Sequence, residues 1–144
     1  MNYLLDTNVL SELRRPLPDR RVVSWLEHVD EDRVFLSVIS IAEVARGLQL
    51  LDPGRRRDAL AQWLEHDLVD RFGSRLLLVD TSAAMIWGRL MADAKRLGRG
   101  LSVMDGWIAA IAVSRDLILV TRNQKDFEGL GMSLFDPWSD DPRG

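Results

Sequence analysis

Residues 2–13, Asn2-Tyr3-Leu4-Leu5-Asp6-Thr7-Asn8-Val9-Leu10-Ser11-Glu12-Leu13, contain the pattern that decides the fold. The short apolar run that ends at Leu5 is typical of a buried strand. Asp6, Thr7 and Asn8 follow it, and side chains of these types begin helices because they accept hydrogen bonds from unpaired backbone N–H groups. The stretch therefore predicts a strand that leads directly into a helix.

The same alternation continues along the chain. Four further segments have the composition of short strands, at residues 34–39, 76–79, 117–120 and, weakly, 133–135. Segments with helical periodicity lie between them, at residues 22–29, 41–51, 59–68, 80–97 and 103–113, with a short helical turn at 123–127. We expect the helix after the second strand to begin at Ser40, and the helix after Gly98 to begin at Ser102. This alternation favours a three-layer α/β sandwich, with a central, mainly parallel sheet of four to five strands flanked by helices.

Length and composition limit the classes of protein to consider. The chain has 144 residues, of which 47% are hydrophobic and 28% charged, as in an ordinary folded domain. We predict one domain over residues 1–138 and a C-terminal tail at 139–144. The absence of cysteine excludes disulfides, thiolate metal sites and cysteine nucleophiles. With no basic leader and no apolar run long enough to span a bilayer, we expect a cytoplasmic protein without a membrane role.

The charge balance does not by itself indicate nucleic-acid binding. The net charge is −3, whereas nucleic-acid-binding domains are usually basic. A nuclease that uses bound divalent cations attracts its substrate partly through those cations, so a mildly acidic chain is compatible with that class. Several arginines near the motifs described below are suited to bidentate phosphate contacts, although each is equally suited to a solvated surface: Arg14, Arg15, Arg46, Arg99 and Arg122.

Polar residues follow three of the predicted strands. Asp6 comes directly after the first, Glu43 lies just beyond the second, and Thr121, Arg122 and Asn123 follow the fourth. In open α/β sheets, ligands bind at the edge formed by the carboxyl ends of the strands. The spacing therefore predicts a functional edge that contains these side chains.

Each acidic residue in these motifs also has a purely structural explanation. An acid three residues after a serine or asparagine fits an N-terminal capping box, and three pairs have this spacing: Ser40 with Glu43, Ser102 with Asp105, and Asn123 with Asp126. Asp6 and Asn8 are likewise suited to cap the first helix. From local spacing alone, capping and catalysis remain open for every one of these residues.

The acids together favour a metal site, because carboxylates that converge on one cleft repel each other unless a cation or protons neutralise them. Oxygen ligands without histidine or cysteine suit Mg²⁺ or Mn²⁺ rather than zinc, and Mg²⁺ commonly contacts substrate phosphates. Such an ion polarises a phosphodiester and lowers the pKa of an attacking water. The acids therefore point to metal-dependent phosphate chemistry without a protein nucleophile.

Four stretches in order along the chain resemble the PIN-domain ribonucleases, and among them the VapC-type toxins of toxin–antitoxin pairs, especially the FitB-like branch. The first is Leu5-Asp6-Thr7-Asn8-Val9-Leu10-Ser11-Glu12, and the second is residues 37–47 around Glu43. The third is Val103-Met104-Asp105-Gly106-Trp107-Ile108-Ala109-Ala110, and the fourth is Thr121-Arg122-Asn123-Gln124-Lys125-Asp126-Phe127. The closing Phe135-Asp136-Pro137-Trp138 is similar to the terminal segment of that branch.

The resemblance implies a Mg²⁺-dependent endoribonuclease, with Mn²⁺ as a possible substitute. Asp6, Glu43 and Asp105 would hold the ion, directly or through water. A fourth acid occurs in the family either at the position of Asn123 or at that of Asp126, and we favour Asp126 as catalytic, with Asn123 assisting. Supporting polar positions that orient the acids or water correspond to Asn8 and Thr121.

Two residues depart from the family pattern. Gly106 and Trp107 stand where smaller or aliphatic side chains are expected. The pattern of charges is unaffected, so this departure concerns the shape of the cleft.

The resemblance also implies partners. An RNA substrate, a cognate antitoxin of the VapB or FitA type and a homodimer are expected, with DNA contacted only indirectly through the antitoxin.

Other function classes fit parts of the same pattern. An α/β phosphoacceptor signalling domain would use Asp80 after the third strand, but it requires an acidic pair after the first strand, where Thr7 and Asn8 stand. A phosphatase of the haloacid dehalogenase type would need an aspartate in place of Asn8. A non-catalytic PIN-like binding module is the remaining alternative.

Overall fold

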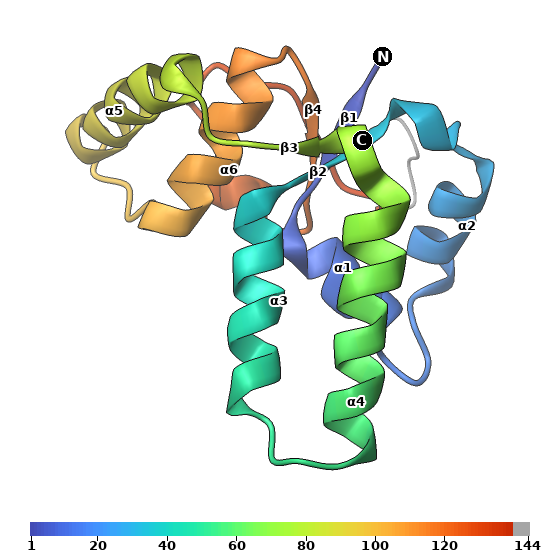
Figure 1. Ribbon diagram of the computed structural model, residues 1–144. Coiled ribbons are helices and arrows are strands. Elements are labelled where there is room, and N and C mark those ends of the chain that lie inside the picture. The colour runs from blue at the N-terminus through green and yellow to red at the C-terminus, as the bar shows by residue number, and fades with distance from the viewer. Residues whose placement is uncertain (140–144) are drawn as a thin grey trace.

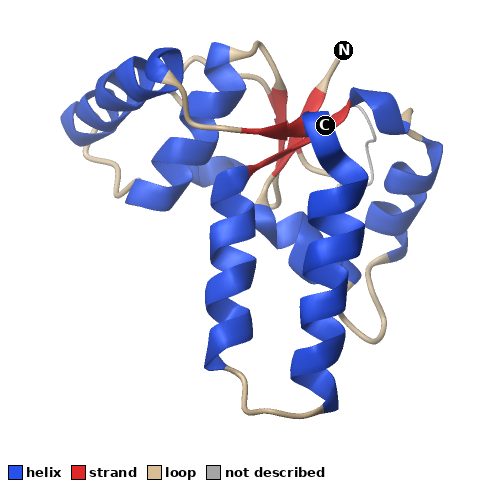
Figure 2. Cartoon of the chain, viewed as in Figure 1, coloured by secondary structure: helices blue, strands red, loops and turns tan. Residues whose placement is uncertain are grey.

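The central element is one parallel sheet. The computed structural model describes residues 1–139, and within them five strands run in the order β3-β2-β1-β4-β5, all parallel (Figure 1; strands red in Figure 2). They span β1 Tyr3–Leu5, β2 Val34–Ser37, β3 Leu76–Leu77, β4 Ile118–Val120 and β5 Leu134–Phe135. The predicted parallel α/β sheet is confirmed, and β1 lies at its centre.

Helices cover both faces of this sheet. The α-helices are α1 Thr7–Leu13, α2 Arg20–His28, α3 Val38–Leu50, α4 Arg55–Gln62, α5 Thr81–Arg96 and α6 Val103–Ser114. A π-helical segment, η2 (Trp63–Asp70), continues α4, and short 3₁₀ turns are η1 Glu31–Arg33, η3 Gly73–Arg75 and η4 Gln124–Asp126. In Figure 1 α3 and the α4–η2 rod run side by side as a hairpin that projects away from the sheet.

The apolar core is divided between the two faces because successive strand residues point to opposite sides. On β1, Leu4 packs with the core of α5 and α6, whereas Leu5 packs with that of α1, α2 and η2. Leu119 and Val120 on β4 divide in the same way. The wide apolar surface predicted for residues 103–113 is explained, since α6 is buried between the sheet and α5.

The start of α3 differs from the prediction. Ser37, not Ser40, is the N-cap, and its hydroxyl accepts a hydrogen bond from the backbone N–H of Ser40 at 3.2 Å. Val38 and Ile39 are β-branched, which favours a strand, but the cap places them in the first helical turn. The Ser40–Glu43 capping box is therefore wrong, and Glu43 lies in the second turn, free of that structural role.

The third strand is also shorter than predicted. It ends at Leu77, and Leu78 and Val79 are exposed on the way to α5. β3 is an edge strand that pairs only with β2, so few hydrogen bonds hold its continuation in the sheet.

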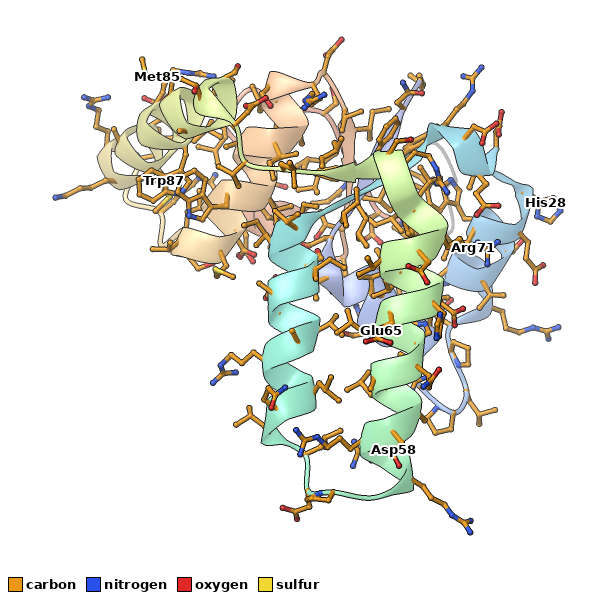
Figure 3. The ribbon with its side chains drawn as sticks, viewed as in Figure 1. His28, Asp58, Glu65, Arg71, Met85 and Trp87 are labelled. Atoms are coloured by element: carbon orange, nitrogen blue, oxygen red, sulfur yellow. The ribbon has the colours of Figure 1, made fainter. Side chains whose placement is uncertain are left out.

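Gly106 and Trp107 both lie where α6 contacts α5. A Cβ at Gly106 would lie 2.6 Å from Met91 Sδ and 2.9 Å from Trp87 Nε1, so the glycine is what lets α5 approach α6. Trp107 stacks on Trp87 with ring centroids 4.6 Å apart, and Figure 3 shows Trp87 on α5. The two departures from the family pattern thus belong to one close contact between α5 and α6.

The C-terminal segment packs on the domain as far as it is described. Trp138 is buried, and its indole N–H donates to the carboxylate of Glu12 at 3.1 Å. Of the predicted tail at 139–144, all but Ser139 lies outside the described residues. Within residues 1–139, every helix is too short or too polar to cross a membrane.

Candidate active site

Asp6 and Thr121 meet at the carboxyl edge of the two central strands. The backbone N–H of Asp6 still belongs to the sheet, since it donates to the carbonyl of Val120 at 2.9 Å. The Thr121 hydroxyl donates to Asp6 Oδ2 at 2.8 Å, and Asp6 Oδ1 accepts from the backbone N–H of Thr7 at 2.7 Å. Asp6 is therefore both the N-cap of α1 and a carboxylate held in one orientation.

The hydroxyl of Thr121 organises the polar residues around Asp6. Thr121 is fully buried and accepts hydrogen bonds from Asn8 Nδ2 at 3.2 Å and from the backbone N–H of Asn123 at 3.1 Å. Together with the bond to Asp6, these use the one donor and both acceptor positions of a hydroxyl. Asn8 Nδ2 also lies 3.4 Å from Asp6 Oδ2.

Glu43 reaches the same place from α3 through Thr7. The Thr7 hydroxyl donates to Glu43 Oε1 at 2.7 Å and lies 2.8 Å from the Ser40 hydroxyl. Because a hydroxyl has one hydrogen, Ser40 must be the donor in the second contact. Sequence reasoning misses Thr7 and Ser40 as site residues, because Thr7 is locally typical of a helix cap and Ser40 of the start of a helix.

Asp105 and Asp126 complete a set of four neighbouring carboxylates. Burial is the main reason why the pKa of Asp6 is raised to about 6, and the charges of Asp105 and Glu43 add to the rise. Hydrogen bonds from Thr121 and Thr7 oppose it without cancelling it. Burial likewise raises the pKa of Asp105, helped by the charge of Asp126 and opposed by a hydrogen bond from Ser102. Asp6 thus interacts with Asp105 and Glu43, and Asp105 interacts with Asp126.

The capping alternative holds for some of these residues and fails for others. Ser102 caps α6 by accepting from the backbone N–H of Asp105 at 3.1 Å, as predicted. Asn123, by contrast, makes no side-chain cap at η4, and its contact with Thr121 comes from the backbone. Asp126 is exposed and acts on Asp105 through its charge. Of the two candidates for the fourth position, Asp126 acts on Asp105 through its charge, and Asn123 acts on Thr121 through its backbone N–H.

The donor set fits a hydrated divalent cation. No group of three or more histidine, cysteine, aspartate or glutamate side chains within residues 1–139 is arranged to hold a metal ion. Mg²⁺ binds through one or two carboxylates and keeps several waters, so it needs no such cage. Asn8 Oδ1 is buried without a hydrogen-bond partner among the described residues, and an acceptor of this kind suits a water bound to the ion.

Asp80, the residue required by the signalling alternative, has a structural role. It caps α5 by accepting from the backbone N–H of Ala83 at 2.9 Å, and it lies 3.6 Å from the guanidinium of Arg115. It follows the edge strand β3, whereas Asp6 follows the central strand. The two carboxylates therefore do not share a site.

Comparison with known proteins identifies the family. Residues 3–131 match the PIN domain. The chain is 38% identical to the toxin FitB of Neisseria gonorrhoeae, over 95% of this chain and 99% of that protein. It is 36% identical to the VapC ribonuclease Y4jK of Sinorhizobium fredii, over 94% and 96% of the two chains.

Solved structures agree. The structure of FitAB bound to the IR36 DNA fragment contains a chain that superposes with a TM-score of 0.90 at 36% identity, covering 95% of this chain and 96% of that one. Sequence, fold and the arrangement of acids at the sheet edge lead to the same assignment. The chain belongs to the PIN domain family, in the branch that contains the FitB and VapC toxins.

Proposed function

We propose that this protein is a metal-dependent endoribonuclease that hydrolyses RNA phosphodiester bonds, and that it is the toxin of a type II toxin–antitoxin system. The observation that carries the proposal is the buried carboxylate of Asp6 at the carboxyl edge of the sheet, whose pKa is raised to about 6 by burial and by the charges of Asp105 and Glu43. Such a cluster is unfavourable as a set of free anions at neutral pH, and a divalent cation relieves it. The relatives named ribonucleases support the choice of RNA as substrate.

The roles of the residues follow from their contacts. Asp6, Glu43 and Asp105 hold the cation, Mg²⁺ or in its place Mn²⁺, directly or through water. A divalent ion bound there supplies positive charge to the phosphate oxygens and lowers the pKa of the attacking water. Thr121 fixes the orientation of Asp6, and Thr7 that of Glu43.

Three further polar residues, Asp126, Asn8 and Asn123, act on the acids that hold the cation or on their neighbours. Asp126 is the fourth catalytic acid and acts next to Asp105, where its charge raises the pKa of that carboxyl. The unpaired Oδ1 of Asn8 would accept a hydrogen bond from a water beside the acids, and the backbone of Asn123 supports Thr121.

The partners follow from the same assignment. A cognate antitoxin of the VapB or FitA type neutralises the enzyme, the enzyme forms a homodimer, and DNA is contacted only through the antitoxin. The solved FitAB complex with a DNA fragment supports this arrangement. A cytoplasmic location, where cellular RNA is accessible, is part of the same proposal.

Removal of metal should abolish cleavage. The purified protein, freed of any partner, is expected to cut RNA with Mg²⁺ or Mn²⁺ and to lose at least about a hundredfold in rate in EDTA, because the acids alone cannot neutralise a phosphodiester. Gel analysis of labelled RNA measures this. An Asp105→Asn protein purified in parallel controls for contaminating ribonucleases. Undiminished cleavage by the parent in EDTA would contradict the metal dependence, whereas a parent that cleaves no RNA with either cation would support the non-catalytic module.

The fourth acid can be identified by a pair of substitutions. Asp126→Asn should lower the cleavage rate about tenfold or more, because it removes a charge that acts on Asp105. Asn123→Ala should have a smaller effect, since its contact with Thr121 uses the backbone N–H, which alanine retains. Initial rates on one RNA at saturating metal compare the two. The reverse order of effects would assign the fourth position to Asn123.

A further inference from the structure

A pocket of about 370 Å³ opens beside the proposed active site, between α1, α3 and the α4–η2 rod. Thr7 and Glu43 belong to its lining, so the acidic set and the pocket share a wall. The volume lies in the range of sites that take small organic ligands. The pocket therefore offers a place for a part of the substrate adjacent to the reacting bond.

Two arginines line the same pocket and outnumber the carboxylate of Glu43 by two to one. Arg14 and Arg56 both contribute to it, and neither forms an ion pair in the part of the chain that the structure describes. Seven other arginines do pair with acids: Arg15, Arg21, Arg33, Arg71, Arg75, Arg96 and Arg115. The guanidinium of Arg14 lies over the ring of Trp63, 5.2 Å from its centroid, which holds the charge at the pocket wall.

The start of α4 adds to this positive charge. Arg55, Arg56 and Arg57 occupy its first turn, where the helix dipole is positive and disfavours cations. The N-cap, Gly54, provides no side-chain hydrogen bond to compensate. Figure 3 shows Asp58 close to this free end of the hairpin. The guanidinium of Arg57 donates to Gln49 Oε1 at 3.0 Å, so of the three arginines it is Arg56 that faces the pocket without such a contact within residues 1–139.

The remaining walls are apolar and leave room for a flat group. Val44, Leu60 and Trp63 line the pocket together with Gly47 of α3. No heavy atom lies within 4 Å of the position that a Cβ on Gly47 would occupy. At this point the helix presents bare backbone to the pocket.

From these features we propose that the pocket binds one nucleotide of the RNA next to the scissile bond. Its phosphate contacts Arg14 and Arg56, and its base packs against the apolar wall formed by Val44, Leu60 and Trp63. The inference rests on the proposed ribonuclease function, because it concerns the same substrate. It makes the pocket a determinant of RNA affinity and of the position of the cut.

The substitution Gly47→Leu tests the apolar part of the pocket. The leucine side chain enters open space, and leucine favours a helix more than glycine does, so the fold should be retained. The Kd for a labelled single-stranded RNA, measured by fluorescence anisotropy in EDTA so that no cleavage occurs, should rise about tenfold. Gly88→Leu is the matched control, since Gly88 lies inside α5 with equally open surroundings and outside the pocket. Its Kd should not change.

The salt dependence of binding tests the charged part. For single strands the slope of log Kd against log salt changes by about 0.7 for each phosphate that the protein no longer neutralises. The double variant Arg14→Ala/Arg56→Ala should lower the slope by about 0.7, because both side chains contact the same phosphate. Arg89→Ala should leave it unchanged, because Arg89 is exposed on α5 outside the pocket.

The outcomes separate this inference from the proposed function. Equal RNA affinity of Gly47→Leu and Gly88→Leu overturns the nucleotide pocket, even if the enzyme cleaves RNA. Loss of antitoxin binding in Gly47→Leu with unchanged RNA affinity makes the pocket a protein-docking site and also overturns it. If the parent protein cleaves no RNA with any divalent cation, the proposed function fails, while the two leucine variants still report on RNA binding.

Discussion

Replacing Asp6 with asparagine should lower the rate of RNA cleavage by at least about a hundredfold, while the metal-free protein becomes as stable as the parent or more stable. Activity falls because the cation loses a charged ligand at the centre of the acidic set. Stability is kept because asparagine is an equally good N-cap and can still accept from the N–H of Thr7. It also removes a buried charge that Asp105 and Glu43 repel.

Cleavage rates at saturating Mg²⁺ and urea unfolding in EDTA measure the two parts of this prediction. Asp80→Asn is the matched control, because Asp80 also caps a helix but lies outside the acidic set. Its cleavage rate should equal that of the parent. If Asp6→Asn cleaves within about tenfold of the parent, Asp6 is not a metal ligand. If instead the variant unfolds readily, the role of Asp6 is structural.

The metal-free protein should become more stable as the pH is lowered from about 7.5 to about 5. Asp6 binds its proton more tightly in the folded state, where its pKa is about 6, than in the unfolded state, where it is 3.8. The stabilisation from this proton is complete below pH 3.8 and is lost as the pH rises through 6. It amounts to about 3 kcal/mol across the whole window, on the order of 10 °C in Tm. The raised pKa of Asp105 acts in the same direction.

The increase in stability with falling pH should end at lower pH, because of Glu12. Burial of Glu12 favours its protonated form, but hydrogen bonds from the Asp19 backbone and the Trp138 indole outweigh burial and lower its pKa. The stability that Glu12 contributes is therefore lost as the pH falls through its folded pKa, below its usual 4.5. In EDTA we therefore expect the stability of the protein to reach a maximum at a pH between the folded pKa of Glu12 and that of Asp6.

Thermal unfolding in EDTA and in Mg²⁺ or Mn²⁺ checks this profile. Near pH 7.5 a cation at a hundred times its Kd should add about 2.7 kcal/mol. Near pH 5 it should add less, because protonated carboxyls bind metal poorly. The Asp6→Asn protein should show a flatter profile and a smaller response to metal. A stability of the parent that increases between pH 5 and 7.5 in EDTA would contradict the raised pKa of Asp6.

The sequence predicts best those parts of the fold and site that depend on strands. Asp6 and Thr121 are expected at the functional edge because each directly follows an apolar strand, and the parallel sheet brings those ends together. The local pattern is sufficient to place these residues, because the carboxyl end of each parallel strand lies at the edge of the sheet where ligands bind.

The parts of the site that depend on contacts between distant elements are harder to predict from the sequence. Asp105 follows a helix cap that is equally good without any catalytic role, so the family resemblance is needed to single it out. The sequence does not reveal the cap at Ser37, because the β-branched residues that follow it are typical of a strand. It therefore also misses the contact between Ser40 and Thr7 and the hydrogen bond from Thr7 to Glu43. Asn123 and Asp126 fit the pattern equally well, and only the electrostatic contact with Asp105 distinguishes them.

The place of β1 in the middle of the sheet has a consequence for the order of folding during synthesis. Asp6 leaves the ribosome well before its hydrogen-bond partner Thr121, which is made 115 residues later. β2 can pair with β1 early, whereas β4 must join from the other side after most of the domain has been translated. Closing so long a loop is a slow, late step. A nascent chain that already contains β1, β2 and α3 therefore lacks the Asp6–Thr121 contact, which forms only when β4 has paired with β1.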